Sequence, residues 1–402
     1  MVQRPSPEVG LRVMCAGMVF VTLTFSALHF LVPLYAIRLG ASPLLLGVLI
    51  ASGHLLPMLV AMSVGRIVDR VGPMRILALG VIGSLVAPCA VIVTPSLATL
   101  AIAQIVAGLG QICLAVASQS LVASLGTAER TDRNFAWYGT ALSVGQLLGP
   151  LTSGVIADLL GLRAAFAALV ISMALTGSAV AVLYRLGFQR RGEARPSVAS
   201  GLHQLRSLGS NVGLQVAFIC STGVLTTIGV AQAFLPAHLD AQSFSAASIG
   251  LLFSVRSLAA VLIQPVLPLV TRVLDGRSNV VVIVMLLVAV GIGGLGLTTS
   301  YVLLASLAFI AGLGAGASVP LSMAMIARAA PGQRGAALAL RLTINRAAQL
   351  VTPIVMGLVV GFVGFGASFL IAGLGLLALT VLVVRMLPNV PDDAANDTTL
   401  GG

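Results

Sequence analysis

The chain has 402 residues, of which 58% are apolar and only 8% are charged, and its mean hydropathy is +1.10. This composition excludes a water-soluble protein of such length, because too few polar groups are present to cover its surface. The net charge of +11 comes from 22 basic residues, all of them arginine, against 11 acids. In a membrane protein this excess reports on topology, so it does not indicate nucleic-acid binding.

Twelve apolar runs are each long enough to cross a bilayer core of about 30 Å as a helix of about 20 residues. Strands are disfavoured because the runs are continuous and do not alternate. We therefore predict an all-α membrane protein with twelve transmembrane helices, and the internal repeat described below divides them into two pseudo-symmetric six-helix bundles. The helices are expected at residues 13–35, 44–63, 76–94, 97–122, 135–157, 164–186, 212–236, 247–269, 279–298, 302–327, 337–360 and 366–386.

The arginines are distributed unevenly along these runs. Seventeen of the 22 fall at one set of helix ends and loops, Arg38 and Arg163 fall at the other set, and three fall inside runs. Short loops rich in arginine stay on the cytoplasmic side. We therefore expect a multi-pass protein of the cell inner membrane with both termini in the cytoplasm.

The first two predicted helices each carry a histidine. His29 and His54 are the titratable groups near mid-depth whose charge changes around neutral pH. We interpret both as candidates for proton coupling. The alternative is that each imidazole is a hydrogen-bonded packing residue.

Residues 65–75 (GRIVDRVGPMR) follow the second predicted helix and read as a tight loop with one acid among three arginines. Its carboxylate could cap a neighbouring helix or pair with these arginines, although an ordinary solvated loop is the alternative. The string resembles the signature loop between helices two and three of the major facilitator superfamily. A degenerate copy, residues 271–277 (TRVLDGR), follows helix eight, where that family keeps a second copy.

This resemblance covers essentially the whole chain and implies a secondary active transporter that works by alternating access. It also implies that Asp69 holds the two halves together at the cytoplasmic face in one state and releases them in the other. The gating residues that it indicates in the two copies are Gly65, Asp69, Arg70, Gly72, Arg75 and Asp275.

Helix five carries the pattern Gly145-x-x-x-Gly149-Pro150-x-x-Ser153-Gly154. It is similar to the antiporter signature of the drug-exporting branches of the superfamily, which implies export. Small residues at this spacing also allow two helices to approach closely, and a proline permits a bend, so packing alone is the alternative. Ser153 stands where the signature prefers glycine, and Ala136 replaces a more distant glycine.

Helix four departs from the family pattern. Drug and proton antiporters usually have a membrane arginine a few residues before a glycine pair, and Gln104 stands at that place. No acid lies at mid-depth, since Asp158 and Asp240 are near the outer helix ends. The sequence therefore offers no carboxylate-based proton relay.

Three arginines lie inside predicted helices, where a charge costs about 3 kcal/mol or more and normally faces a cavity or a partner. Arg341 is near a helix end and could reach Asp69 or the cytoplasmic surface, which favours a structural role. Arg256 and Arg346 have no mid-membrane acid to neutralise them. We hypothesise that they recognise an anionic or strongly polarised group on the substrate, because a guanidinium suits a planar anion; pairing with helix carbonyl groups is the alternative.

Further polar residues lie on helices that line the central cavity in the resembled family. Each is a candidate for substrate binding, and the alternative for each is an interhelical hydrogen bond. These residues are Gln104, Gln111, Tyr138, Gln146, Gln232 and Asn345.

The second half of the chain repeats the first at an offset of 203 to 204 residues. The strings at 145–150 and 348–353 correspond, as do those at 107–110 and 311–314. Single residues also correspond, namely Pro33 with Pro236, Ser42 with Ser245, and Gly47 with Gly250. A duplicated helical bundle is how many carriers build a site between two halves.

From this repeat we predict four regions. A bundle of six helices at 1–186 is followed by a polar cytoplasmic linker at 187–211, a second bundle at 212–387 and a disordered tail at 388–402.

No catalytic or nucleotide-binding motif is present, so we expect a transporter driven by a gradient and not an enzyme, with no cofactor and no metal. Its expected partners are a small-molecule substrate, protons and the lipid bilayer, and we expect a monomer. The predicted function is proton-coupled export of small apolar or acidic organic compounds. The alternatives are proton-coupled uptake of an organic anion or vitamin-like solute, and a sensor built on a carrier fold.

Overall fold

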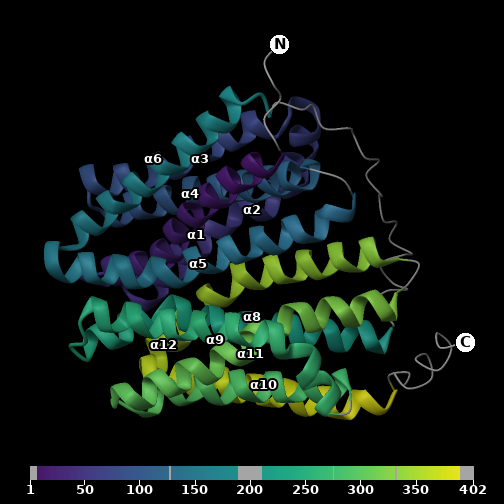
Figure 1. The fold of residues 1–402 in the computed structure, drawn as a ribbon. Coiled ribbons are helices and arrows are strands. Elements are labelled where there is room, and N and C mark those ends of the chain that lie inside the picture. The colour runs from purple at the N-terminus through teal and green to yellow at the C-terminus, as the bar shows by residue number, and fades with distance from the viewer. Residues whose placement is uncertain (1–6, 126–127, 189–210, 275, 331–332, 390–402) are drawn as a thin grey trace, which may run out of the picture. The chain divides into compact units, whose positions relative to one another are not determined.

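The computed structural model describes residues 7–125, 128–188, 211–274, 276–330 and 333–389. These residues are almost entirely helical and contain no strand (Figure 1), which confirms the predicted fold class. Most of the predicted linker, most of the predicted tail and Asp275 lie outside the described residues.

The apolar runs of the sequence form long helices. The first half contains α1 (Pro7–Arg38), α2 (Pro43–Val71), α3 (Pro73–Val93), α4 (Leu97–Ser124), α5 (Ala128–Leu160) and α6 (Leu162–Arg185). The second half contains α8 (Val212–Ala241), α9 (Ala246–Val273), α10 (Arg277–Gly294), α11 (Tyr301–Ala329) and α12 (Arg334–Met386), with 3-10 turns at Leu295–Leu297 and Leu387–Asn389.

Within the described residues, 11 helices are long and apolar enough to cross a membrane. One of them, α12, has 53 residues and holds two membrane lengths, because its backbone breaks at Gly364, where φ is 81°. The twelve predicted spans are therefore all present, and the last two are joined at this glycine without a loop.

The predicted loop at residues 65–75 is wrong, because most of it is helix. Helix α2 continues to Val71, Gly72 alone makes the connection with φ 88°, and α3 begins at Pro73. Only Gly72 needs the freedom of glycine, and proline suits the first helical position because it has no backbone N–H to leave unpaired. Gly65 lies inside the helix, with open space where a Cβ would be.

The chain divides into two compact units, each described here by itself. Unit 1 consists of residues 1–196, 232–254 and 353–361, so it contains α1 to α6 together with parts of α8, α9 and α12. Unit 2 consists of residues 197–231, 255–352 and 362–402. The domain boundaries expected from the sequence repeat stay a prediction.

The two units contain the same glycine contacts at repeat-related positions. In unit 1, a Cβ on Gly108 of α4 would meet the carbonyl of Gly53 on α2, and one on Gly110 would meet the carbonyl of Gly80 on α3. In unit 2, Gly312 of α11 meets the carbonyl of Arg256, and Gly314 meets that of Val284. The repeated Ala-Gly-Leu-Gly string is therefore explained by close helix packing.

The packing and capping contacts within unit 1 also explain two other repeat-related pairs of residues. Ser42 and Ser245 cap α2 and α9, because their hydroxyls accept the N–H groups of Leu45 at 3.3 Å and Ser248 at 3.2 Å. Gly47 lies against the carbonyl of Pro353, and its counterpart Gly250 lies against the carbonyl of Pro150.

Candidate functional site

A hydrogen-bonded cluster in unit 2 joins α8 to α12. Arg341 donates from Nε to the Ser221 hydroxyl at 2.9 Å, and Asn345 donates from Nδ2 to the same oxygen at 2.9 Å. Thr222 donates to Oδ1 of Asn345 at 2.8 Å. Arg341 and Asn345 are four residues apart and so share a face of α12. We call these four residues the Arg341 cluster.

The Arg341 cluster carries a net positive charge and is buried except for Thr222, which is half-buried. Arg341 is only 3% exposed, Ser221 4% and Asn345 9%. Among the described residues no acid forms an ion pair with Arg341 or with Arg346. A buried guanidinium without a counter-ion is costly unless other groups or a ligand satisfy it.

Arg341 lies deeper than the sequence indicated. Helix α12 begins at Arg334, three residues before the predicted start, so Arg341 is two turns inside it, about 10 Å along at 1.5 Å per residue. Its side chain is nearly enclosed and takes part in the polar network. This location differs from the surface position that its place near a helix end suggested.

The other two predicted arginines also belong to unit 2. Arg346, on α12, is half-buried and follows Asn345 directly. Arg256, on α9, is half-buried, and its backbone carbonyl contacts Gly312 of α11. In the repeat Arg256 corresponds to Gly53, the residue before His54, so the two positions are at equivalent places in their units.

Unit 1 brings the two predicted proton-coupling residues together. The rings of His29 on α1 and His54 on α2 are stacked, with centroids 6.4 Å apart and an interplanar angle of 28°. Gln104 of α4 is 8% exposed, and its Nε2 lies 3.5 Å from where a Cβ on Gly53 would be. A polar group from α4 therefore lies beside the residue that precedes His54.

The remaining polar candidates do not form one site. Tyr138 is buried, and its hydroxyl lies 2.8 Å from that of Ser118 on α4, as expected for an interhelical hydrogen bond. Gln146 is exposed, whereas Gln111 and Gln232 are half-buried.

The glycines of the α5 pattern are packing residues within unit 1. A Cβ on Gly145 would overlap Thr22 and the carbonyl of Val19, and one on Gly149 would overlap Ser26 and the carbonyl of Leu23. The backbone of α5 thus rests directly on α1. Pro150 and Gly154 lie on a different face of α5, where a Cβ on Gly154 would meet the carbonyl of Ala246 on α9 and one on Gly250 of α9 would meet the carbonyl of Pro150.

The gating motif lies at the end of α2 and the start of α3. Asp69 is half-buried, while Arg70 and Arg75 are exposed. The ion pairs recorded in the described part of the chain are Arg38–Asp240 at 3.1 Å, Arg130–Glu8 at 3.5 Å and Arg133–Glu8 at 4.0 Å, and none includes Asp69. The gating role of Asp69 stays a prediction.

The sequence did not indicate three residues that the structure brings into polar networks. Ser221 and Thr222 organise the Arg341 cluster, and Asp158 binds the start of α9 through the N–H groups of Ala246 at 2.9 Å and Ala247 at 2.8 Å. Serine and threonine are common in membrane helices, so Ser221 differs from the other serines only by its hydrogen bonds to Arg341 and Asn345 on the neighbouring helix. No sequence signal relates Asp158 to a helix 88 residues away.

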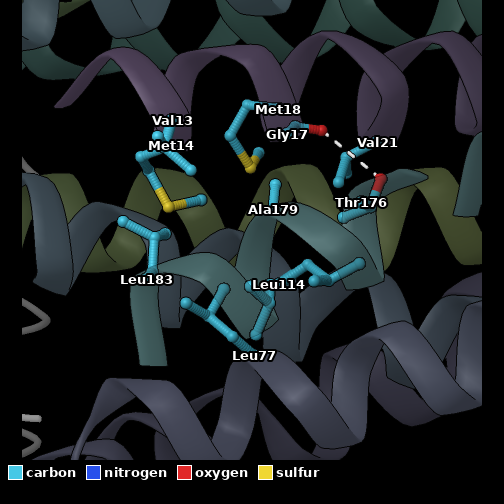
Figure 2. A pocket seen from close by; sticks show the side chains of 11 residues that line it. Val13, Met14, Gly17, Met18, Val21, Leu77, Leu114, Thr176, Ala179 and Leu183 are labelled. Atoms are coloured by element: carbon cyan, nitrogen blue, oxygen red, sulfur yellow. Dashed lines mark hydrogen bonds between the residues drawn. The ribbon is translucent and has the colours of Figure 1, made fainter. Parts of the chain in front are cut away.

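A small cavity inside unit 1 is separate from all these residues (Figure 2). It lies between α1, α3, α4 and α6 and is lined by apolar side chains, among them Met14, Met18, Leu77 and Leu114. Its one polar side chain, Thr176, donates to the carbonyl of Gly17 at 3.4 Å. None of the predicted site residues lines it, so it does not fit the expected substrate site.

The sequence matches the family model described as Major Facilitator Superfamily over residues 14–237 and again over residues 216–402. The chain therefore belongs to the major facilitator superfamily, and it is a multi-pass membrane transporter that carries small solutes by alternating access. No curated protein sequence shows a significant match to the chain.

Several solved structures have the same fold. A peptide transporter, POT, in complex with sulfate is 16% identical with a TM-score of 0.77, covering 95% of this chain and 94% of that one. A bacterial homologue of the human lysosomal transporter Spinster is 13% identical with a TM-score of 0.77, covering 98% and 100%. A variant of the nucleoside transporter NupG is 16% identical with a TM-score of 0.76, covering 94% and 99%. At these identities the likeness concerns the fold alone.

Proposed function

We propose that this transporter exports small apolar or acidic organic compounds in exchange for protons. The observation that carries the proposal is the Arg341 cluster, where a nearly enclosed guanidinium is held by neutral side chains and by no acid of the described residues. A solute that brings a negative charge would neutralise it. Arg346, half-buried on the same helix, would add to the positive potential at this side.

The stacked His29 and His54 support a proton-coupled mechanism. Two imidazoles from different helices stack within a unit that offers no mid-helix acid among its described residues, and imidazole is the side chain that takes up a proton near neutral pH. We assign the proton to this pair, with Gln104 as a polar neighbour on α4.

The direction of transport is argued from α5. Its resemblance to the antiporter signature favours export, and Gly145 and Gly149, which bring the backbones of α5 and α1 into direct contact, are the small residues of that pattern. Proton-coupled uptake of an organic anion is the second candidate, because the positive cluster would serve either direction. We further propose cytoplasmic termini in the inner membrane, on the distribution of the arginines.

Flux into proteoliposomes under an imposed pH gradient tests the proposal. A candidate carboxylate should move against its own gradient when protons flow the other way, and protein-free liposomes give the passive rate to subtract. His29→Gln with His54→Gln should abolish coupling to the pH gradient while leaving exchange of solute for solute. Movement of solute and protons in the same direction would replace export with the uptake alternative, and absence of any gradient-driven flux would contradict both.

A further inference from the structure

The hydrogen bonds of the Arg341 cluster leave more donors than acceptors unused. The Ser221 hydroxyl oxygen accepts from Arg341 and from Asn345, which occupies both of its lone pairs. Its own proton must then point to another acceptor, and the described part of the chain records none for it. Oδ1 of Asn345 already accepts from Thr222, which fixes the orientation of the amide.

Arg341 adds further unmatched donors. Only its Nε–H has a hydrogen bond among the described residues, so both terminal amino groups are left over. These terminal nitrogens also remain accessible. Fully enclosed side-chain atoms without a hydrogen-bond partner include Ser84 Oγ, Gln242 Oε1 and Gln349 Oε1, but no atom of Arg341 is among them. The cluster therefore has more unused donors than unused acceptors. The donors are the Ser221 proton, the four terminal N–H groups of Arg341 and the second N–H of Asn345, and the acceptors are one lone pair on Asn345 Oδ1 and the hydroxyl oxygen of Thr222.

We propose that Arg341, Ser221 and Asn345 form the subsite for a carboxylate group on the transported solute, with Ser221 as the specificity-determining residue. The inference rests on the proposed function and names the chemistry of its substrate. The guanidinium fork would bind the two oxygens of a planar carboxylate, and the Ser221 proton would complete the donors. Asn345 and Thr222 are positioning residues, because they act by fixing the Ser221 oxygen and the amide.

The donor count makes a sharp distinction between an acid and its amide. A carboxylate only accepts hydrogen bonds, whereas a primary amide of the same shape would place its NH₂ group against another donor. That mismatch leaves buried donors unpaired, which is strongly discriminating. An apolar remainder on the solute is compatible with the surrounding helices, so the carboxylate carries the selectivity.

Thermal unfolding of the purified full chain in detergent measures this selectivity directly. The probes are benzoate, phenylacetate and hexanoate, each compared with its primary amide at a pH where the acid is ionised. A ligand that binds only the folded protein raises the melting temperature, by an amount that grows with the logarithm of its concentration divided by its Kd. We expect at least one acid to raise it in a dose-dependent way, and its amide to need at least tenfold higher concentration for the same shift.

Three variants test the residues. Ser221→Ala should lower the affinity for the acid at least tenfold and reduce the preference over the amide. Asn345→Asp is nearly isosteric and supplies an internal counter-ion to Arg341, so it should remove the response to the acid without unfolding the protein. Ser322→Ala is the matched control and should respond like the wild type. Ser322 is a buried serine of unit 2 whose one hydrogen bond within the described residues goes to the Val319 carbonyl of its own helix.

Two results would overturn the carboxylate subsite. The first is an equal shift of the melting temperature with acids and with amides, which includes no shift with either. The second is an undiminished shift with the acid in Asn345→Asp. The proposed function fails separately. If carboxylates bind with the expected selectivity but no pH-driven flux is seen, the subsite is supported and proton-coupled export is contradicted. If pH-driven flux is seen without selectivity for acids, proton-coupled export is supported and the subsite is contradicted.

Discussion

Single residues in this transporter are chosen as much for size as for chemistry. Gly145 and Gly149 of α5 have no room for a side chain, because the backbone of α1 lies directly on them, whereas Gly139 of the same helix faces open space. The antiporter-like pattern is therefore also a packing requirement within unit 1. Packing alone would favour the same glycines as an antiporter signature, so the pattern alone could not separate the two explanations.

Gly145→Ala should destabilise the protein, and Gly139→Ala should not. The added methyl group would overlap Thr22 and the carbonyl of Val19, and overpacking of this kind costs about 1–3 kcal/mol. Gly139 has nothing within 4 Å of its Cβ position, and alanine is the better helix former. Melting temperatures of the two variants in the same detergent give the comparison; equal values would show that α5 can move away from α1 at little cost.

Helices could be predicted from the sequence, but their ends could not. The twelve spans follow from hydropathy, since apolar runs of this length have no other stable form in lipid. Their ends were missed because polar residues such as Arg66 and Asp69 extend α2 beyond the apolar run, and Gly72 alone replaces the expected loop. The arginines of the candidate site could be identified from the sequence, because they are charges inside apolar runs. Ser221 could not be identified in this way, because its role depends on a contact with Arg341, 120 residues away.

The break in α12 depends on a glycine. Gly364 has φ 81° and ψ 170°, a region that is essentially restricted to glycine and costs other residues about 1–3 kcal/mol, so Gly364→Ala should destabilise the joint between the last two spans. Gly361→Ala is the control, because Gly361 also has open space around its Cβ position but an ordinary helical backbone. Thermal unfolding should separate the two variants, and a Gly364→Ala protein as stable as the control would contradict the assigned strain.

The start of α9 is held by a carboxylate on α5. Both oxygens of Asp158 accept backbone N–H groups, from Ala246 and Ala247, in addition to the Ser245 cap. Asp158→Asn retains one acceptor and loses the charge that favours a helix N-terminus, so it should destabilise the protein by about 1 kcal/mol. Asp240→Asn removes an exposed ion pair with Arg38 and should matter less. A larger loss of melting temperature in Asp240→Asn would contradict this ranking.

At the scale of the whole molecule, duplication has produced two units with the same helix packing and different chemistry. Repeat-related glycines make the same contacts in each unit, yet unit 1 carries the histidine pair and unit 2 carries the buried Arg341 with the half-buried Arg256 and Arg346. In the repeat, Tyr138 and Arg341 are equivalent, and one bonds Ser118 while the other bonds Ser221. We infer that divergence after duplication separated proton binding from anion recognition.

That separation is the central claim, and the pH dependence of carboxylate affinity tests it most directly. Coupling between two sites is reciprocal, so in a proton antiporter the protonated histidine pair must weaken binding of the acid. We predict that the dissociation constant of the best carboxylate probe rises as the pH is lowered from about 8 to about 6. Over this range the acid stays ionised, whereas imidazole becomes protonated. This dependence should disappear in His29→Gln with His54→Gln. An affinity that does not change with pH, or a dependence that survives in the double variant, would contradict the account.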